Sequence, residues 1–310
     1  MASEPERQSE EYRFEQLAPG VYFGEARRQG TALSNAGVVD LGDSALAFDT
    51  GLTLRAGREL RRAVQILTKK PLGLSANSHW HMDHILGNQL FEDRPIYATR
   101  RTVEILLERR AEFERDLTRE KIEADLREIG GQKGTVSEPT KDQREEYAMA
   151  LRINRTLLDE VLELRFTPPS ATFDGSLDLP GARKARLVTF GGGHTESDAL
   201  LVLPAERIVF AGDLVVSGRH PNLLSGNPPQ WIEILKRIEA LQPERIVTGH
   251  GPMGNLETVR MLGDYLTFLT GHAQSTGRLD VPAPFRDWIG EGQFQRNLDF
   301  VRSQNKSPPR

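Results

Sequence analysis

The stretch "NSHWHMDHILGN", residues 77 to 88, holds three of the seven histidines in this 310-residue chain. His79, His81 and His84 fall within six positions, together with Asp83. At the chain's own frequencies of His and Asp, such a string arises by chance in roughly 2 of 10,000 chains of this length. The chain has no cysteine, so any metal must be held by nitrogen and oxygen. The stretch therefore indicates a metal site built from imidazoles and carboxylates.

The sequence before this stretch predicts strands and one helix that deliver the histidines to a strand end. Short strand-like segments, "GVYFGEA", "NAGVVDLG" and "SALAFDTG", lie between residues 14 and 51 and are separated by Gly, Asn and Asp turn signals. This spacing is typical of consecutive antiparallel strands. Residues 54–70 predict an amphipathic helix that ends at Pro71, and "LGLSANS" predicts a buried strand that ends beside His79.

Three more candidate ligands stand where an apolar strand gives way to a glycine-rich turn. They are His194 in "TFGGGHTESD", Asp213 in "VFAGDLV" and His250 in "IVTGHGP". Strand ends on a rigid scaffold can converge on one site, and the glycines allow tight turns and close approach. With the four earlier residues this makes seven candidates, which is more than one tetrahedral ion uses. The set suits two metals about 3.5 to 4 Å apart that share a carboxylate.

The organisation along the chain predicts an α/β fold with a helical insertion. Apolar residues at helical spacing lie among many charged residues over about 99–166, and a Gly-rich segment at 130–139 separates two helical runs. The charges suit solvated helix faces, with a lid or a homodimer contact as alternatives. Two sheet-forming halves, each followed by helices, suggest a four-layer α/β/β/α sandwich. We predict a disordered tail at 1–12 and a single domain over 13–310.

Composition excludes several classes of protein. Without cysteine there is no disulfide framework, thiolate zinc site or cysteine nucleophile. The net charge of −4 argues against a nucleic-acid partner, which favours a basic patch. No apolar run approaches the roughly 20 residues of a membrane span. The acidic first dozen residues lack the apolar stretch of a signal peptide, so we expect a cytoplasmic protein with a small-molecule substrate.

The chain resembles the metallo-β-lactamase superfamily, and within it the glyoxalase II-like branch, over about residues 15 to 270. The resemblance rests on the motifs "FDTG" (48–51), "HWHMDH" (79–84), "GGGHTESD" (191–198), "FAGD" (210–213) and "TGHG" (248–251). It implies a metallo-β-lactamase fold and two Zn²⁺ ions, with Fe or Mn and a mixed or mononuclear centre as alternatives. The first metal would be held by His79, His81 and His194, the second by Asp83, His84 and His250, with Asp213 bridging them.

Four further residues are candidates for supporting roles. The resemblance implies that Asp49 supports a metal ligand from behind the site, and Thr195 is a candidate for the same role, although both also suit plain turns. His220 and Trp80 are candidates for substrate contact. The alternative for His220 is a hydrogen-bonded or surface histidine, and the alternative for Trp80 is packing.

The expected function is that of a metal-dependent hydrolase. A hydroxide that bridges two metals would attack a carbonyl-type bond of the thioester, lactone or β-lactam class in a small molecule. Asp83 would act as a catalytic residue by holding the second metal and orienting the nucleophile. One alternative is a mononuclear iron dioxygenase of the persulfide type, which would use His79, His194 and Asp213. The other is a non-catalytic metal-binding or interaction protein that uses the helical insertion as its interface.

Overall fold

The structure, a computed structural model, describes residues 9–132 and 140–306 and divides the chain into two compact units. The first unit comprises residues 1–173 and 180–183, and the second comprises 174–179 and 184–310. Each unit contains one of the two sheets. The residues that we predicted to form a single domain thus group into two units.

The first unit is built on a seven-stranded sheet whose strands follow the order of the sequence. The strands are β1 (Tyr12–Ala18), β2 (Val21–Ala26), β3 (Ala36–Asp40), β4 (Ala45–Phe48), β5 (Leu72–Ala76), β6 (Ile96–Thr99) and β7 (Ala171–Phe173). Strands β1 to β4 pair antiparallel, which confirms the predicted opening, whereas β4 to β7 pair parallel. Parallel neighbours need a crossover connection, and helical segments provide it here.

Helix α2 (Leu54–Thr68) is the crossover from β4 to β5 and matches the helix predicted at 54–70. The Thr53 hydroxyl oxygen accepts a hydrogen bond from the backbone N–H of Ala56 and so caps its first turn. Leu60 and its apolar neighbours on the same stripe are buried against the strands. The helix ends at Lys69, which adopts the left-handed backbone conformation typical of a helix end. Helix α2 therefore covers one face of the sheet just before the chain enters the histidine-rich stretch.

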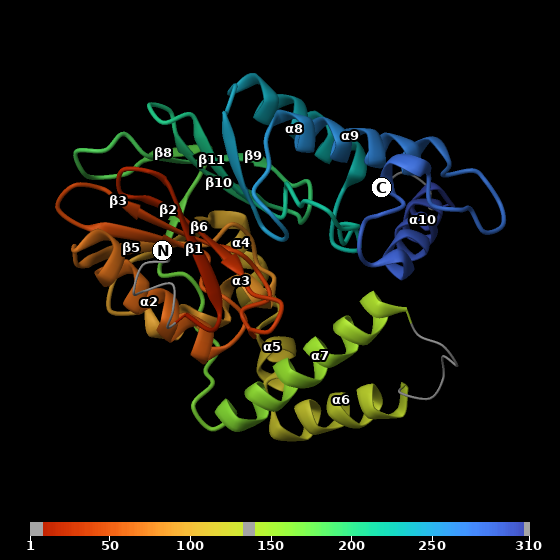
Figure 1. Ribbon diagram of the computed structural model, residues 1–310, viewed down its shortest axis with the longest axis horizontal. Helices are drawn as coiled ribbons and strands as arrows, with labels where there is room; N and C mark the ends of the chain where they lie inside the picture. Colours follow the sequence, from red (N-terminus) through yellow and green to blue (C-terminus); the bar gives the residue numbers. More distant parts are fainter. Residues whose placement is uncertain (1–8, 133–139, 307–310) are drawn as a thin grey trace. The chain divides into compact units, whose positions relative to one another are not determined.

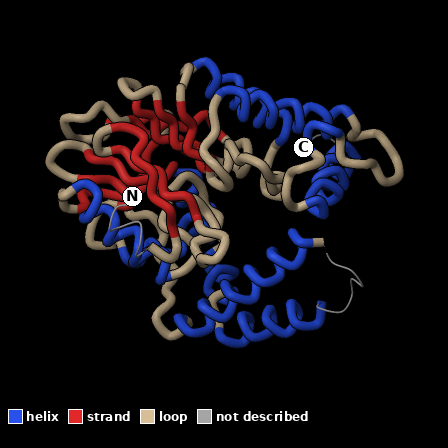
Figure 2. Tube along the Cα trace, viewed as in Figure 1, coloured by secondary structure: helices blue, strands red, loops and turns tan. Residues whose placement is uncertain are grey.

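The predicted insertion is helical and connects β6 to its parallel neighbour β7. It contains α4 (Arg100–Glu108), α5 (Arg110–Asp116), α6 (Arg119–Gln132) and α7 (Lys141–Glu160). Helices α6 and α7 lie side by side, and nearly the whole described segment is helix (Figures 1 and 2). Their apolar seam is a buried cluster that includes Leu117, Ile122, Ile153 and Leu157. Part of the predicted Gly-rich connection, residues 133–139, lies outside the described residues.

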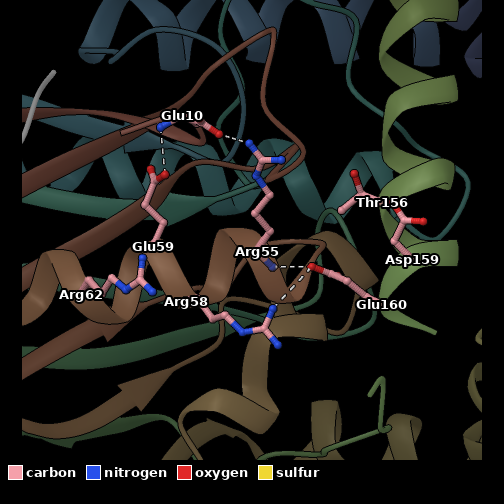
Figure 3. Close-up of a pocket in the computed structure, with 8 residues that line it drawn as sticks. All are labelled: Glu10, Arg55, Arg58, Glu59, Arg62, Thr156, Asp159 and Glu160. Atoms are coloured by element: carbon pink, nitrogen blue, oxygen red, sulfur yellow. Dashed lines mark hydrogen bonds and ion pairs between the residues drawn. The ribbon is translucent and has the colours of Figure 1, made fainter. Parts of the chain in front are cut away.

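A buried carboxylate fixes the end of the insertion to α2. Glu160 accepts a hydrogen bond from the backbone N–H of Leu54 at 2.8 Å. It accepts a second from the backbone N–H of Arg55 at 2.7 Å (Figure 3). Burial raises the pKa of Glu160, whereas these two hydrogen bonds lower it. A negative charge at the first turn of a helix is stabilising, because the N–H groups there lack partners within the helix. The last turn of α7 is therefore anchored to the sheet-covering helix.

The fold begins earlier than we predicted. Residues 1–8 of the predicted tail (1–12) lie outside the described residues, but Glu11 and Tyr12 are buried and Tyr12 opens β1. The Glu59 carboxylate of α2 accepts hydrogen bonds from the backbone N–H groups of both residues. This carboxylate, which belongs to a distant segment of the sequence, therefore binds the backbone at the start of β1, inside the segment that we predicted as the tail.

The second unit contains a five-stranded sheet in the order β12-β11-β10-β9-β8. Its strands are β8 (Ser176–Asp178), β9 (Arg186–Gly191), β10 (Asp198–Leu203), β11 (Ile208–Gly212) and β12 (Arg245–Thr248). Only β11 and β12 pair parallel, and α8 (Pro228–Ala240) connects them. Helix α8 packs against α9 (Leu256–Gly271), and both belong to the second half, where we expected helices in addition to strands.

A further helix, α10 (Glu291–Lys306), follows α9 and was not predicted. Phe294, Leu298 and Val301 recur at helical spacing and join the core of the second unit. In the sequence, the polar residues around these three conceal the apolar stripe. None of the helices within the described residues is both long enough and apolar enough to cross a bilayer.

Candidate metal centre

The histidine-rich stretch of the first unit follows directly from β5. Buried His79 and His84 and half-buried His81 lie close together, with ring centroids of His79 at 4.7 Å from His81 and 4.2 Å from His84. The chain turns sharply here because His81 is the N-cap of a single-turn helix, α3 (Met82–Ile85). This turn brings the first three candidate histidines and Asp83 together at the end of the strand.

Asp49 organises two of these histidines through one hydrogen-bond network. It directly follows β4 and has a φ of 59°, in the left-handed region that Asp tolerates better than most residues. Its carboxylate lies 2.8 Å from His84 Nδ1 and accepts hydrogen bonds from the backbone N–H of Ser78 at 2.7 Å and from the Ser78 hydroxyl at 2.9 Å. The same hydroxyl oxygen is 2.9 Å from His79 Nδ1.

This network fixes the tautomer of both imidazoles. A carboxylate only accepts hydrogen bonds, so His84 must carry its proton on Nδ1. The Ser78 hydroxyl donates to Asp49, which leaves its oxygen to accept from Nδ1 of His79. Metal-binding histidines commonly use one nitrogen for the metal and the other for such a bond. In both rings, therefore, Nε2 would be the metal-binding atom, and His84 Nε2 lies 3.4 Å from a carboxylate oxygen of Asp83.

The second unit gathers the other three candidates around a single carboxylate oxygen. His194 follows β9, Asp213 follows β11 and His250 follows β12, each at a strand end as predicted. The Nε2 atoms of His194 and His250 lie 3.4 and 3.2 Å from Oδ2 of Asp213. Two ligand atoms about 2.1 Å from a tetrahedral ion lie about 3.4 Å apart. The donor types and separations of both clusters therefore fit residues that bind metal.

The loop that carries His194 is held by Asp198, which the sequence analysis did not single out. Its buried carboxylate accepts hydrogen bonds from the backbone N–H groups of Gly193, His194 and Thr195, at 2.8 to 3.2 Å. Burial raises the pKa of Asp198 to about 7, although these hydrogen bonds by themselves lower it. The Thr195 hydroxyl also donates to Asp198, at 2.8 Å, so Thr195 completes a turn. An Asp four residues after a His in a glycine-rich loop is the signal that could have identified this role.

Gly249 has no space for a side chain beside Asp213. A Cβ at this position would overlap the Asp213 carboxylate and lie 2.6 Å from the carbonyl carbon of Gly212. We expect Gly249→Ala to displace the carboxylate and to weaken metal binding, measured with Zn²⁺, by at least about 10-fold, as loss of a ligand-positioning contact does. Competition with a chromophoric chelator would measure the affinity.

The matched control is Gly263→Ala on α9, where the nearest atom to a new Cβ would be 3.9 Å away. Replacing a helical glycine by alanine is stabilising by about 0.5 to 1 kcal/mol when space allows. Zinc affinity in this control should be unchanged. Equal affinities for the two variants and the unchanged protein would show that Gly249 does not position Asp213.

Both candidates for substrate contact are buried. Trp80 is 7% exposed, its ring centroid lies 6.2 Å from that of Phe113, and the Arg109 guanidinium lies over it at 4.4 Å. His220 is 4% exposed, and its ring lies 5.4 to 5.8 Å from those of Tyr265, Trp288 and Phe294. Both positions agree with the alternatives that we gave to substrate contact: Trp80 packs against neighbouring side chains, and His220 is a buried, hydrogen-bonded histidine of the second unit.

A polar network holds the His220 ring in one tautomer. Asn297 Nδ2 donates to the Tyr265 hydroxyl oxygen at 3.0 Å and to the carbonyl of Pro221 at 2.7 Å. The Tyr265 hydroxyl lies 3.2 Å from His220 Nδ1 and can donate its proton there. Nδ1 is then the acceptor, and the neutral ring carries its proton on Nε2. The network joins α9, α10 and the segment after β11.

Burial also lowers the pKa of His220 to about 4 from an ordinary value of 6.5. The folded protein thus binds a second proton on the His220 ring more weakly than the unfolded chain does. The free energy of unfolding therefore falls as the pH drops from 6.5 toward 4. Between pH 7 and 5, the metal-free protein should lose about 2 kcal/mol more unfolding free energy than His220→Asn does. Urea denaturation at both pH values measures this difference, and identical losses would show that His220 does not titrate in this way.

Comparisons with known proteins identify the fold. The model of the metallo-β-lactamase superfamily matches residues 30–250, which is more than half of the chain. The DIM-1 metallo-β-lactamase aligns with a TM-score of 0.58 and 19% identity, over 83% of this chain and 98% of its own. A metallo-β-lactamase from Pontibacter korlensis aligns with a TM-score of 0.58 and 17% identity, over 83% of this chain and 99% of its own.

The metallo-β-lactamase FIM-1 from Pseudomonas aeruginosa, in its mono-zinc form, gives a TM-score of 0.55 and 17% identity, over 83% of this chain and 95% of its own. A search of curated proteins gives no match. At these identities the solved structures show the fold alone, and they confirm the fold predicted from the sequence. Because the family model covers most of the chain, the protein belongs to the metallo-β-lactamase superfamily.

Proposed function

We propose that the two clusters together bind metal and that the protein is a metal-dependent hydrolase. The observation that carries the proposal is the approach of two imidazole Nε2 atoms to Oδ2 of Asp213, at 3.2 and 3.4 Å. The tautomers set by Asp49 in the first unit support it, because they assign Nε2 of His79 and His84 to metal binding. The match to the superfamily model includes all seven candidate ligands.

The donor set favours a metal of intermediate softness. The candidates are five imidazoles and two carboxylates, namely His79, His81, His84, His194, His250, Asp83 and Asp213. Imidazole suits Zn²⁺ and Fe, whereas a site of carboxylates alone would suit Mg²⁺ or Mn²⁺. We propose two Zn²⁺ ions, with Asp213 as the shared carboxylate, because seven ligands exceed the needs of one tetrahedral ion.

The reaction that we propose is hydrolysis of a carbonyl-type bond, in a thioester, a lactone or a β-lactam. A bound divalent ion supplies a Lewis acid and lowers the pKa of water to about 7, so that a nucleophile exists at neutral pH. Asp83 is half-buried beside His84 and can accept a hydrogen bond that orients the attacking water. Asp49 and Ser78 hold the imidazoles in place, and Asp198 holds the loop of His194.

The test is hydrolysis by protein stripped with a chelator and then reloaded with Zn²⁺, Mn²⁺ or Fe²⁺. The panel is a small thioester, a lactone, a β-lactam and a phosphodiester. We expect no turnover without metal, and turnover of at least one carbonyl substrate after zinc is restored. Failure of every reloaded form on the whole panel would contradict the hydrolase, and oxygen uptake with a persulfide by the iron form would favour a dioxygenase.

A further inference from the structure

The two residues on either side of His81 pack against the helical insertion. Trp80 belongs to a buried cluster with Ile105, Leu106 and Phe113, which come from α4 and α5. Met82 packs against this cluster and also against the cluster that α6 and α7 contribute. His81 thus lies between two side chains whose packing partners belong to the insertion.

Trp80 is the more direct of these links. Its indole meets the His81 ring edge to face, with centroids 4.4 Å apart and planes at 78°. Two further groups contact the indole. The Phe113 ring stands nearly perpendicular to it, with centroids 6.2 Å apart, and the Arg109 guanidinium carbon lies 4.4 Å from the indole centroid. Phe113 in turn stacks on Phe166 at 5.3 Å. A continuous row of rings therefore connects His81 to the end of the insertion.

The insertion is itself anchored at several points, so its packing against Trp80 is fixed. Glu160 binds the first turn of α2, as described above. Arg152 donates to the carbonyls of Arg28 and Gly30, at 2.6 and 3.2 Å, and Asn88 donates to the carbonyl of Thr167 at 3.1 Å. These bonds join both α7 and the segment after it to the rest of the first unit. They favour a rigid support over a lid that opens.

We propose that the helical insertion positions the metal-ligand segment 79–84 through Trp80, which is a positioning residue for metal binding. This inference rests on the proposed metal centre. His81 is only half-buried, so its own contacts leave its side chain some freedom. Packing of Trp80 and Met82 on either side restricts the rotamers of His81, and less conformational entropy is then lost when metal binds. Groups that orient metal ligands typically change metal affinity about 10- to 100-fold when they are removed.

The experiment compares zinc affinity, by chelator competition, in the full chain and in three variants. Trp80→Leu should bind zinc about 10- to 100-fold more weakly, and Trp80→Phe, which keeps a ring, should recover most of the affinity. Phe113→Leu does not touch a candidate ligand and should shift affinity in the same direction. The visible spectrum of the Co²⁺-loaded protein should change in Trp80→Leu, because the geometry around His81 changes.

Leu107→Ala, at an α4 residue that is 52% exposed, is the matched control and should bind zinc like the unchanged protein. Circular dichroism shows whether each variant is folded, and titrations well below the melting temperature then measure its zinc affinity alone. If Trp80→Leu does not fold, Phe113→Leu still tests the connection between the insertion and His81. Unchanged affinity in both Trp80→Leu and Phe113→Leu would overturn the inference. Absence of zinc binding by the unchanged protein would instead overturn the proposed function, and this inference with it.

Discussion

Asp213→Ala is expected to lower the zinc content of the candidate centre to one ion or none and to lower hydrolysis by about 10³-fold, which corresponds to ~4 kcal/mol of transition-state stabilisation. The reason is that one carboxylate oxygen of Asp213 faces the Nε2 atoms of both His194 and His250. Removing it takes away the only carboxylate in the cluster of the second unit. Metal content by mass spectrometry and turnover of the best panel substrate measure the two losses together.

Asp287→Ala provides the control for this variant, because Asp287 is an exposed carboxylate of the same unit. Its metal content and turnover should match those of the unchanged protein. An Asp213→Ala protein that loses its metal and yet keeps full activity would show that metal is not used in the reaction. A variant that keeps its metal would show that Asp213 is not an essential ligand.

Asp49→Asn is expected to weaken zinc binding by about 10- to 100-fold, although the two side chains have nearly the same shape. Asn is among the residues that tolerate the left-handed backbone at position 49. An amide, however, cannot accept every hydrogen bond that this carboxylate accepts from Ser78 and His84. If its NH₂ group faces His84 Nδ1, the proton of that ring must move to Nε2, the atom that would bind metal.

The control is Asp40→Asn, because the Asp40 carboxylate accepts its hydrogen bond from a local turn, from the N–H of Gly42 at 2.7 Å. Zinc titration by chelator competition should separate the two variants clearly. The NMR spectrum of the imidazole nitrogens should also show the change of His84 tautomer in metal-free Asp49→Asn. Equal zinc affinity for Asp49→Asn and the unchanged protein would show that Asp49 does not support metal binding.

The sequence predicted the strand-end positions of the candidate ligands well, because each signal was local. An apolar strand followed by glycines and a histidine or aspartate describes His194, Asp213 and His250 without any long-range information. The same holds for α2, whose amphipathic pattern and following Pro71 marked its extent to within two residues. Local periodicity and turn chemistry were sufficient in these segments.

What the sequence did not predict depends on contacts between distant segments. The partners of Trp80 lie about 25 to 86 positions further along the chain, so the local sequence left both packing and substrate contact open. For His220 the two alternatives also stayed open, because Tyr265 and Asn297, which form its hydrogen-bond network, lie more than 40 positions further along the chain. Asp198 was missed for a different reason: its carboxylate folds back onto the backbone of Gly193, His194 and Thr195 in its own loop, and no periodicity in the sequence marks such a turn.

The central claim is that this chain binds two metal ions through the seven candidate ligands. The most direct test is the zinc content of protein purified without a metal-chelating tag, dialysed with excess Zn²⁺ and then freed of unbound metal. Close to two zinc ions per chain, falling to one or none in Asp213→Ala, is the predicted result. A chain that retains no zinc, or one whose zinc content is unchanged in Asp213→Ala, would contradict the account.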